Sequence, residues 1–67
     1  MKTQHQKIYD YMKNVGSISP MDAFRKLGIT KLSTRIGEMR RKGIPIESKM
    51  VDSEHSRYMC YWLKEEK

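Results

Sequence analysis

The sequence predicts a mostly α-helical fold that ends in a small β-hairpin. Two observations support this prediction. Apolar residues recur at helical spacing in three successive segments, and the period then changes to that of a strand. A glycine follows each of the three helical segments, at Gly16, Gly28 and Gly43. The 67 residues have room for a single domain with one small core, which we expect to span residues 1–67.

The first helix is predicted at about residues 4–15. Ile8, Met12 and Val15 are spaced by four and three residues, which is the pattern of an amphipathic helix. Gly16 follows the last apolar residue, where a helix end favours a left-handed glycine.

The second helix is predicted at about residues 20–27. Ser19 can accept hydrogen bonds from free helix amides, and Pro20 suits the first helical position. Asp22 completes a pattern like a capping box. The expected apolar face consists of Ala23, Phe24 and Leu27.

The third helix is predicted at about residues 31–42, with Thr30 as its N-cap. Its apolar residues are again spaced by four and three, and they are Leu32, Ile36 and Met39. The link between the second and third helices has only about three residues, as a helix-turn-helix requires.

Two strands are predicted at about residues 44–50 and 57–63, joined by a polar turn. Pro45 cannot continue a helix, and residues 57–63 are dense in aromatic and apolar side chains. Alternation places Met59, Tyr61 and Leu63 toward the helices. The opposite registry stays open, because both faces of this strand are apolar. Three helices followed by a hairpin make a three-helix winged helix-turn-helix.

The positive charge of the chain favours an anionic partner. The sequence has 14 Lys and Arg against 8 Asp and Glu, which gives a net charge of +6. Nucleic acid, an acidic lipid surface and simple solubility all agree with this balance, so the position of the charges decides.

The third helix is the best candidate for contact with double-stranded DNA. With Leu32 at the centre of the buried face, its far side combines short hydroxyls with cationic side chains. A solvated helix face is the alternative, and the short turn before the helix favours contact. The predicted contacts are Thr30, Lys31, Ser33, Thr34, Arg35 and Arg41. Glu38 is expected to pair within the helix, with Lys31 or Arg41, or to accept from a cytosine amino group.

The hairpin offers a second, smaller set of expected contacts. Lys49 and Arg57 flank its tip, where a wing can follow the phosphate backbone or a minor groove. A solvated turn is the alternative. Trp62 and Tyr58 have three interpretations: core packing, a subunit interface, or stacking on unpaired bases.

Several short motifs resemble a family of small winged helix-turn-helix proteins that are common in bacterial phages and prophages. The matching residues are 18–23 (I-[ST]-P-x-x-A), 27–30 (L-G-I-T), 32–36 (L-[SA]-x-R-I), 39–46 ([LM]-[RK]-[RK]-x-G-x-P-I) and 61–63 (Y-x-L). This resemblance implies a DNA-binding module in phage gene control. The hairpin tip lacks the glycine and the additional basic residues of these relatives, a departure that concerns the wing and not the third helix.

The sequence also predicts what the protein lacks. Cys60 is the only cysteine, and no close Cys/His cluster suggests a metal site. No phosphate-binding glycine loop or nucleophile motif is present, and His5 and His55 are expected to be solvated. We therefore expect no enzymatic activity, metal, cofactor or small-molecule substrate. The lone thiol, and the lack of both a secretory segment and a membrane-spanning run, predict a cytoplasmic location in a bacterial host cell.

The leading functional hypothesis is a phage or prophage transcriptional regulator. One alternative is a protein-interaction module, as an adaptor or a host-directed phage inhibitor. Another is an excision-type architectural DNA binder. A homodimer would suit palindromic DNA sites.

Overall fold

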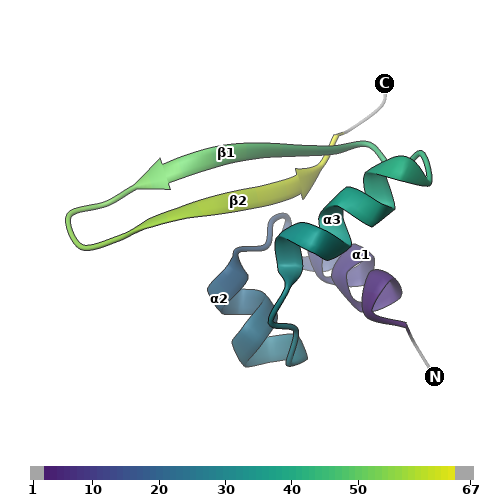
Figure 1. The fold of residues 1–67 in the computed structure, drawn as a ribbon, viewed down its shortest axis with the longest axis horizontal. Helices are drawn as coiled ribbons and strands as arrows, with labels where there is room; N and C mark the ends of the chain where they lie inside the picture. Colours follow the sequence, from purple (N-terminus) through teal and green to yellow (C-terminus); the bar gives the residue numbers. More distant parts are fainter. Residues whose placement is uncertain (1–2, 65–67) are drawn as a thin grey trace.

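The computed structural model describes residues 3–64, which form a set of short helices and a two-stranded antiparallel hairpin (Figure 1). This confirms the expected mostly α-helical fold with a small hairpin. The elements follow in the order α1 (Gln4–Val15), α2 (Pro20–Asp22), η1 (Ala23–Leu27), α3 (Leu32–Arg41), β1 (Ile46–Asp52) and β2 (Arg57–Leu63).

Helix α1 is capped at both ends by local hydrogen bonds. The Thr3 hydroxyl accepts from the Gln6 amide at 3.1 Å, and the Gly16 amide donates to the Met12 carbonyl at 2.9 Å. Met12 is buried on the inner face of the helix, but the prediction for Val15 was wrong. Val15 is 62% exposed, because it lies in the last turn and borders an open hollow beside Leu27 rather than the core.

The start of α2 follows from the capping box that the sequence predicts. The Asp22 amide donates to Ser19 Oγ at 3.2 Å, and the Ser19 amide donates to Asp22 Oδ2 at 3.3 Å. From Ala23 the helix continues as the wider π-helical segment η1, which ends at Gly28 in a left-handed conformation with φ of 69°. A side chain at this position would strain the backbone, so glycine is required for the turn into α3.

The apolar face expected for the second helix needs one correction. Ala23 is fully buried and Leu27 is half-buried, but Phe24 is 58% exposed. Adjacent residues of a helix point in different directions, also in the wider π-helical segment, so Phe24 does not share the narrow inner face with Ala23.

Helix α3 buries the three predicted apolar residues, Leu32, Ile36 and Met39. The predicted N-cap was wrong. Lys31 occupies that position and makes no side-chain cap bond, while the exposed Thr30 lies one residue earlier. Lys31 and Lys42 therefore flank the helix as its cap residues, which shortens it from the predicted 31–42.

The core draws on α1, η1, α3 and both strands, and it includes two isoleucines from the interhelical links. It consists of Ile8, Met12, Ile18, Ala23, Ile29, Leu32, Ile36, Met39, Ile46 and Tyr61. Ile18 also forms a short bridge with β2: its amide donates to the Tyr61 carbonyl at 2.8 Å, and the Tyr61 amide returns a bond of 2.9 Å. The base of the hairpin is thereby fixed to the helices.

Strand β1 begins at Ile46, two residues later than the predicted start at residue 44. The Ile44 amide donates to the Met39 carbonyl at 3.2 Å and so completes the end of α3, and Pro45 has no N–H to donate. At its other end, the ladder extends to the Asp52–Arg57 pair. Strand β1 therefore includes Val51 and Asp52, which were predicted to belong to the turn.

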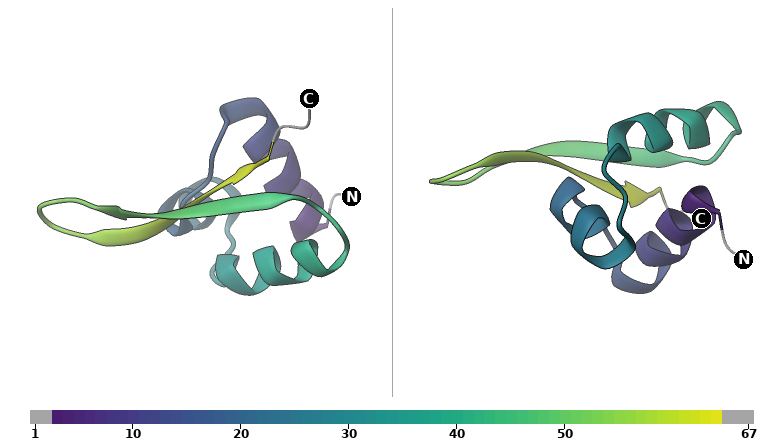
Figure 2. Two further views of the ribbon diagram at one scale, coloured as in Figure 1. Left: turned by 90° about the horizontal axis from the view of Figure 1, so that it is seen from above. Right: turned by 60° about the horizontal axis from the view of Figure 1, so that its bottom comes forward.

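The registry of β2 agrees with the alternation favoured by the sequence. Tyr61 is 6% exposed and faces the helices, paired with Ser48 across the ladder. Trp62 lies on the opposite face, half-buried, where its indole Nε1 donates to Glu47 Oε2 at 3.2 Å. Beyond its base, the hairpin projects away from the helices, so its tip stands apart from them (Figure 2). No helix in the described part of the chain is long and apolar enough to cross a membrane.

Candidate nucleic-acid interface

The outer face of α3 presents polar and cationic side chains to solvent. Lys31, Ser33, Thr34 and Arg41 are all exposed. Within residues 3–64, none of these four side chains has a hydrogen bond or an ion pair. The opposite face of α3 is buried, so these side chains are fixed in direction by the packing and are available to a ligand. We call these four residues the outer stripe of α3.

The flank of α3 that faces α1 carries a polar network. Glu38 Oε1 accepts from Arg35 Nη1 at 2.9 Å and lies 2.8 Å from His5 Nε2. His5 Nδ1 lies 3.1 Å from Lys42 Nζ. An ammonium group can only donate, so Nδ1 accepts from Lys42 and the proton resides on Nε2, which donates to Glu38. We call these four residues the His5–Glu38 network.

This network corrects two expectations from the sequence. Glu38 does pair within α3 as expected, but its partner there is Arg35 instead of Lys31 or Arg41, and it also bonds a residue of α1. The His5 side chain is only 22% exposed and is held between two partners, so it is not simply solvated. No local pattern in the sequence indicates this contact, because 33 residues separate His5 from Glu38.

The network also stabilises the charged form of Glu38. The hydrogen bond from His5 is the main reason that the pKa of Glu38 lies below its ordinary value of 4.5. The positive charges of Arg35 and Lys42 lower this pKa further, against the opposing effect of partial burial. Glu38 therefore remains an anion beside the outer stripe at neutral pH.

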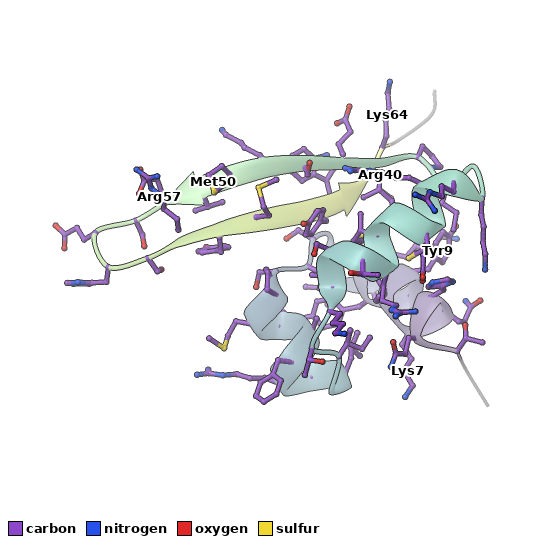
Figure 3. The ribbon with its side chains drawn as sticks, viewed as in Figure 1. Lys7, Tyr9, Arg40, Met50, Arg57 and Lys64 are labelled. Carbon is purple, nitrogen blue, oxygen red and sulfur yellow. The ribbon has the colours of Figure 1, made fainter. Side chains whose placement is uncertain are left out.

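The other flank of α3 is attached to the wing through Arg40. Arg40 Nε donates to the Ile46 carbonyl at 3.1 Å, and Nη2 donates to Ser48 Oγ at 3.2 Å (Figure 3). Helical geometry puts Arg40 and Arg35 on opposite edges of α3, but no local pattern in the sequence predicts the bonds of Arg40 to β1. The helix is therefore held on both flanks, with the outer stripe between them.

The charge on α3 and its cap residues is strongly positive. Residues 31–42 include one acidic side chain, Glu38, and five cationic ones, a net of four positive charges. The cationic residues are Lys31, Arg35, Arg40, Arg41 and Lys42. Such a concentration on one exposed helix is the electrostatic pattern of a nucleic-acid interface.

The tip of the hairpin has a different charge balance. Arg57 Nε lies 3.5 Å from Asp52 Oδ2, and His55 Nε2 lies 3.8 Å from Glu54 Oε2. Lys49 is exposed on β1, and Arg57 lies in the distal half of the hairpin (Figure 3). Residues 49–57 contain two cations and two carboxylates, so their formal charge cancels. DNA contacts at Lys49 and Arg57 stay a prediction that the fold permits.

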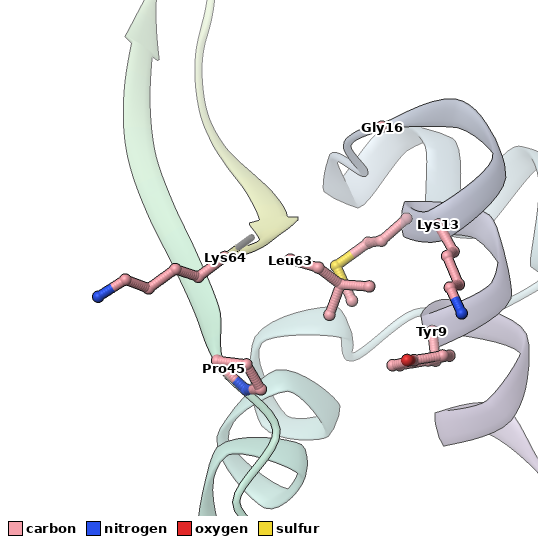
Figure 4. A pocket seen from close by; sticks show the side chains of 7 residues that line it. Tyr9, Lys13, Gly16, Pro45, Leu63 and Lys64 are labelled. Carbon is pink, nitrogen blue, oxygen red and sulfur yellow. The ribbon is translucent and has the colours of Figure 1, made fainter. Parts of the chain in front are cut away.

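A groove between α1 and the hairpin base shows no set of catalytic groups. It has a volume of about 500 Å³ and is lined by Tyr9, Met12, Lys13, Gly16, Pro45, Leu63 and Lys64 (Figure 4). The Lys13 ammonium lies 5.6 Å from the centre of the Tyr9 ring. These lining residues include no carboxylate, imidazole or thiol for acid–base or nucleophilic chemistry. Over residues 3–64, no three His, Cys, Asp or Glu side chains come together as metal ligands would.

The arrangement as a whole defines a class of protein. A short turn joins η1 to α3, the exposed face of α3 is basic, and a hairpin stands beside it, which are the features of a winged helix-turn-helix domain. The chain belongs to the winged helix-turn-helix domain family, whose model matches residues 3–66. Neither a search of curated proteins nor one of solved structures found a match. The family assignment supports DNA binding, with DNA as the partner.

Proposed function

We propose that this protein binds specific sites on double-stranded DNA through α3 and regulates transcription in a phage or prophage. The observation that carries the proposal is the outer stripe of α3, which has no partner within the described residues and lies on a helix held at both flanks. Phage gene control is supported by the resemblance of the motifs between residues 18 and 46. This role agrees with the predicted cytoplasmic location in a bacterial host cell and with the predicted lack of enzymatic activity.

The geometry of α3 suits a major groove. An α-helix with its side chains is about 10–12 Å across, which matches the groove width of about 12 Å, and the 10 residues of α3 extend about 15 Å. The residues at the start of such a helix usually contact bases. Ser33, Thr34 and Arg35 are therefore assigned to base edges, and Lys31 and Arg41 to phosphates. Thr30, exposed just before the helix, can add a phosphate contact.

The first test is the salt dependence of DNA binding. Fluorescence anisotropy with a random-sequence duplex, at several salt concentrations, should show weak binding with a log–log slope of about −3 to −5. This slope corresponds to roughly four or five neutralised phosphates. Absence of binding at low salt would contradict the proposal.

The second test concerns sequence recognition. A specific site is first selected from a random duplex library with the wild-type protein. The double variant Thr34→Ala and Arg35→Ala should then lose about tenfold or more in affinity for that site, since a good base contact contributes about 1–3 kcal/mol. Lys13→Ala removes one charge from the groove behind α1 and is the matched control. Equal affinities of the double variant and the control would exclude base contact by α3.

A protein-interaction module is the second candidate, and one surface favours it. Met21 and Tyr58, 56% and 40% exposed, line a hollow of about 540 Å³ between the start of α2 and the distal hairpin. A 1:1 complex with a host protein that duplex DNA does not displace would support this function.

Bending of a bound duplex, measured by energy transfer between its ends, would instead indicate an architectural, excision-type role. Light scattering of the bound and free protein tests the homodimer.

A further inference from the structure

The Glu38 carboxylate lies on the DNA-facing helix although it repels phosphate. Its Oε1 atom is shared between His5 Nε2 at 2.8 Å and Arg35 Nη1 at 2.9 Å. The side chains are partly buried, with exposed fractions of 22% for His5, 31% for Arg35 and 38% for Glu38. The anion is thus part of a defined contact between two helices and is not a freely solvated side chain.

Three features restrain this contact. Glu38 and Arg35 lie one turn apart on α3, so their pairing follows from the helix geometry. His5 comes from α1, and its second ring nitrogen is engaged by Lys42. The packing of α1 against α3 therefore sets the position of the carboxylate, which in turn holds the guanidinium of Arg35.

The restrained guanidinium still has donors to offer. A guanidinium has five N–H groups, and the single bond to Glu38 engages one of those on Nη1. In the described part of the chain, Arg35 has no other side-chain bond. The remaining donors can bind a DNA acceptor while Glu38 stays in place.

The two kinds of DNA acceptor respond differently to Glu38. A phosphate carries a negative charge, and a carboxylate a few ångströms away repels it. The O6 and N7 atoms of guanine carry only partial negative charges, so the carboxylate repels them less than it repels a phosphate. A fixed carboxylate beside Arg35 therefore weakens phosphate binding more than base binding, which is discrimination by an added repulsive element.

We propose that Glu38, positioned by His5, determines specificity by directing Arg35 to base edges and away from backbone phosphates. This inference rests on the proposed function of α3. His5 acts through Glu38, so it is a positioning residue.

The test is Glu38→Gln, which keeps the size and the accepting oxygen of the side chain but removes its charge. The affinity for a random-sequence duplex should rise about three- to tenfold at low salt. The salt slope should become steeper by about 0.9, because one more phosphate is neutralised. The affinity for the selected site should rise less, so the ratio of specific to non-specific affinity falls.

Matched variants separate this effect from a change in net charge or in folding. Glu47→Gln makes the same charge change on the outer face of β1, where Glu47 bonds Trp62, and should leave the slope unchanged. His5→Ala should shift the slope in the same direction as Glu38→Gln but less. His5→Gln can still donate to Glu38 and should restore the wild-type slope. Thermal melting shows that each variant is folded.

The outcomes are distinguishable. A wild-type salt slope and specificity ratio in Glu38→Gln, or a loss of affinity for both duplexes, would overturn the inference and leave DNA binding by α3 intact. If Glu38→Gln does not fold, a wild-type slope in His5→Ala overturns the inference in the same way. A wild-type protein without salt-dependent binding would overturn both the inference and the proposed function.

Discussion

Helix α3 and the tip of the hairpin both carry cations at the surface, but they differ in how these charges are partnered. On α3, Lys31 and Arg41 have no partner among the described residues, and the whole segment has a net of four positive charges. At the tip, Arg57 is close to Asp52, and the formal charge of residues 49–57 cancels. The two regions therefore differ both in the number of their cations, five against two, and in the share of that charge that nearby carboxylates cancel.

The two regions also differ in rigidity. The inner face of α3 is buried and both of its flanks are bonded, on one side to His5 and on the other to β1 through Arg40. The tip of the hairpin extends beyond the helices and is held by the ladder and by the turn that the Ser53 amide closes on the Ser56 carbonyl (Figure 2). A preorganised surface loses less entropy on binding, so α3 is the better platform for sequence recognition.

We expect the largest difference between the two regions in how much an apolar side chain contributes to the free energy of unfolding. Ile36 is 1% exposed at the centre of α3, so Ile36→Ala should lower the free energy of unfolding by about 2–4 kcal/mol. Met50 is 53% exposed on the hairpin, and Met50→Ala should change it by less than about 0.5 kcal/mol. Urea unfolding followed by circular dichroism measures both. Equal losses would mean that the distal hairpin contributes to the core.

The next effect concerns DNA affinity. The double variant Lys31→Ala and Arg41→Ala should weaken binding about ten- to a hundredfold and reduce the salt slope by about two, one for each lost phosphate contact. The matched double variant Lys49→Ala and Arg57→Ala should change affinity by less than about threefold. If the hairpin variant lost more affinity for DNA than the α3 variant, the wing and not α3 would make the main contact.

A smaller effect is expected where the two regions meet. Arg40→Ala removes both bonds to β1 and should lower the free energy of unfolding by about 0.5–1.5 kcal/mol. The same change should speed hydrogen exchange of the β1 amides more than that of the α1 amides. Unchanged exchange in β1 would show that the wing does not depend on α3 for its order.

The smallest effect is on the pH dependence of stability. The folded state lowers the pKa of Glu38 below its ordinary value of 4.5, so the unfolded chain takes up this proton at a higher pH than the folded chain. The resulting stabilisation is present above about pH 4.5 and is lost as the pH falls through the lowered pKa. Glu38→Gln should therefore flatten the acid limb of the stability curve. Identical acid limbs in the wild type and Glu38→Gln would contradict this assignment.

The local signals of the sequence predicted much of the fold. The capping box at Ser19 and the spacing of Ile8 and Met12 depend on neighbours within one or two helical turns, and the structure has them as predicted. The cap at Thr30 failed because the helix starts one residue later, without a side-chain cap. The start of β1 shifted because the end of α3 uses the Ile44 amide, a competition that no strand pattern reveals.

The candidate site was predictable only in part. Helical geometry placed Lys31, Thr34 and Arg41 on the outer face, which is where the structure has them. The contact of His5 with Glu38 spans 33 residues, and that of Arg40 with the wing depends on the path of the chain after Gly43. Such contacts arise from the packing of whole elements against one another, so local sequence patterns do not predict them.

The proposed function requires that α3, and not the hairpin tip, makes the main contact with DNA. The most direct measurement is a titration of the ¹⁵N-labelled protein with a short duplex that contains the selected site, followed by amide chemical shifts. If α3 makes the contact, the largest shifts should fall on residues 30–42, with small shifts on residues 49–57. The largest shifts on the hairpin tip, with α3 unaffected, would contradict the proposed function.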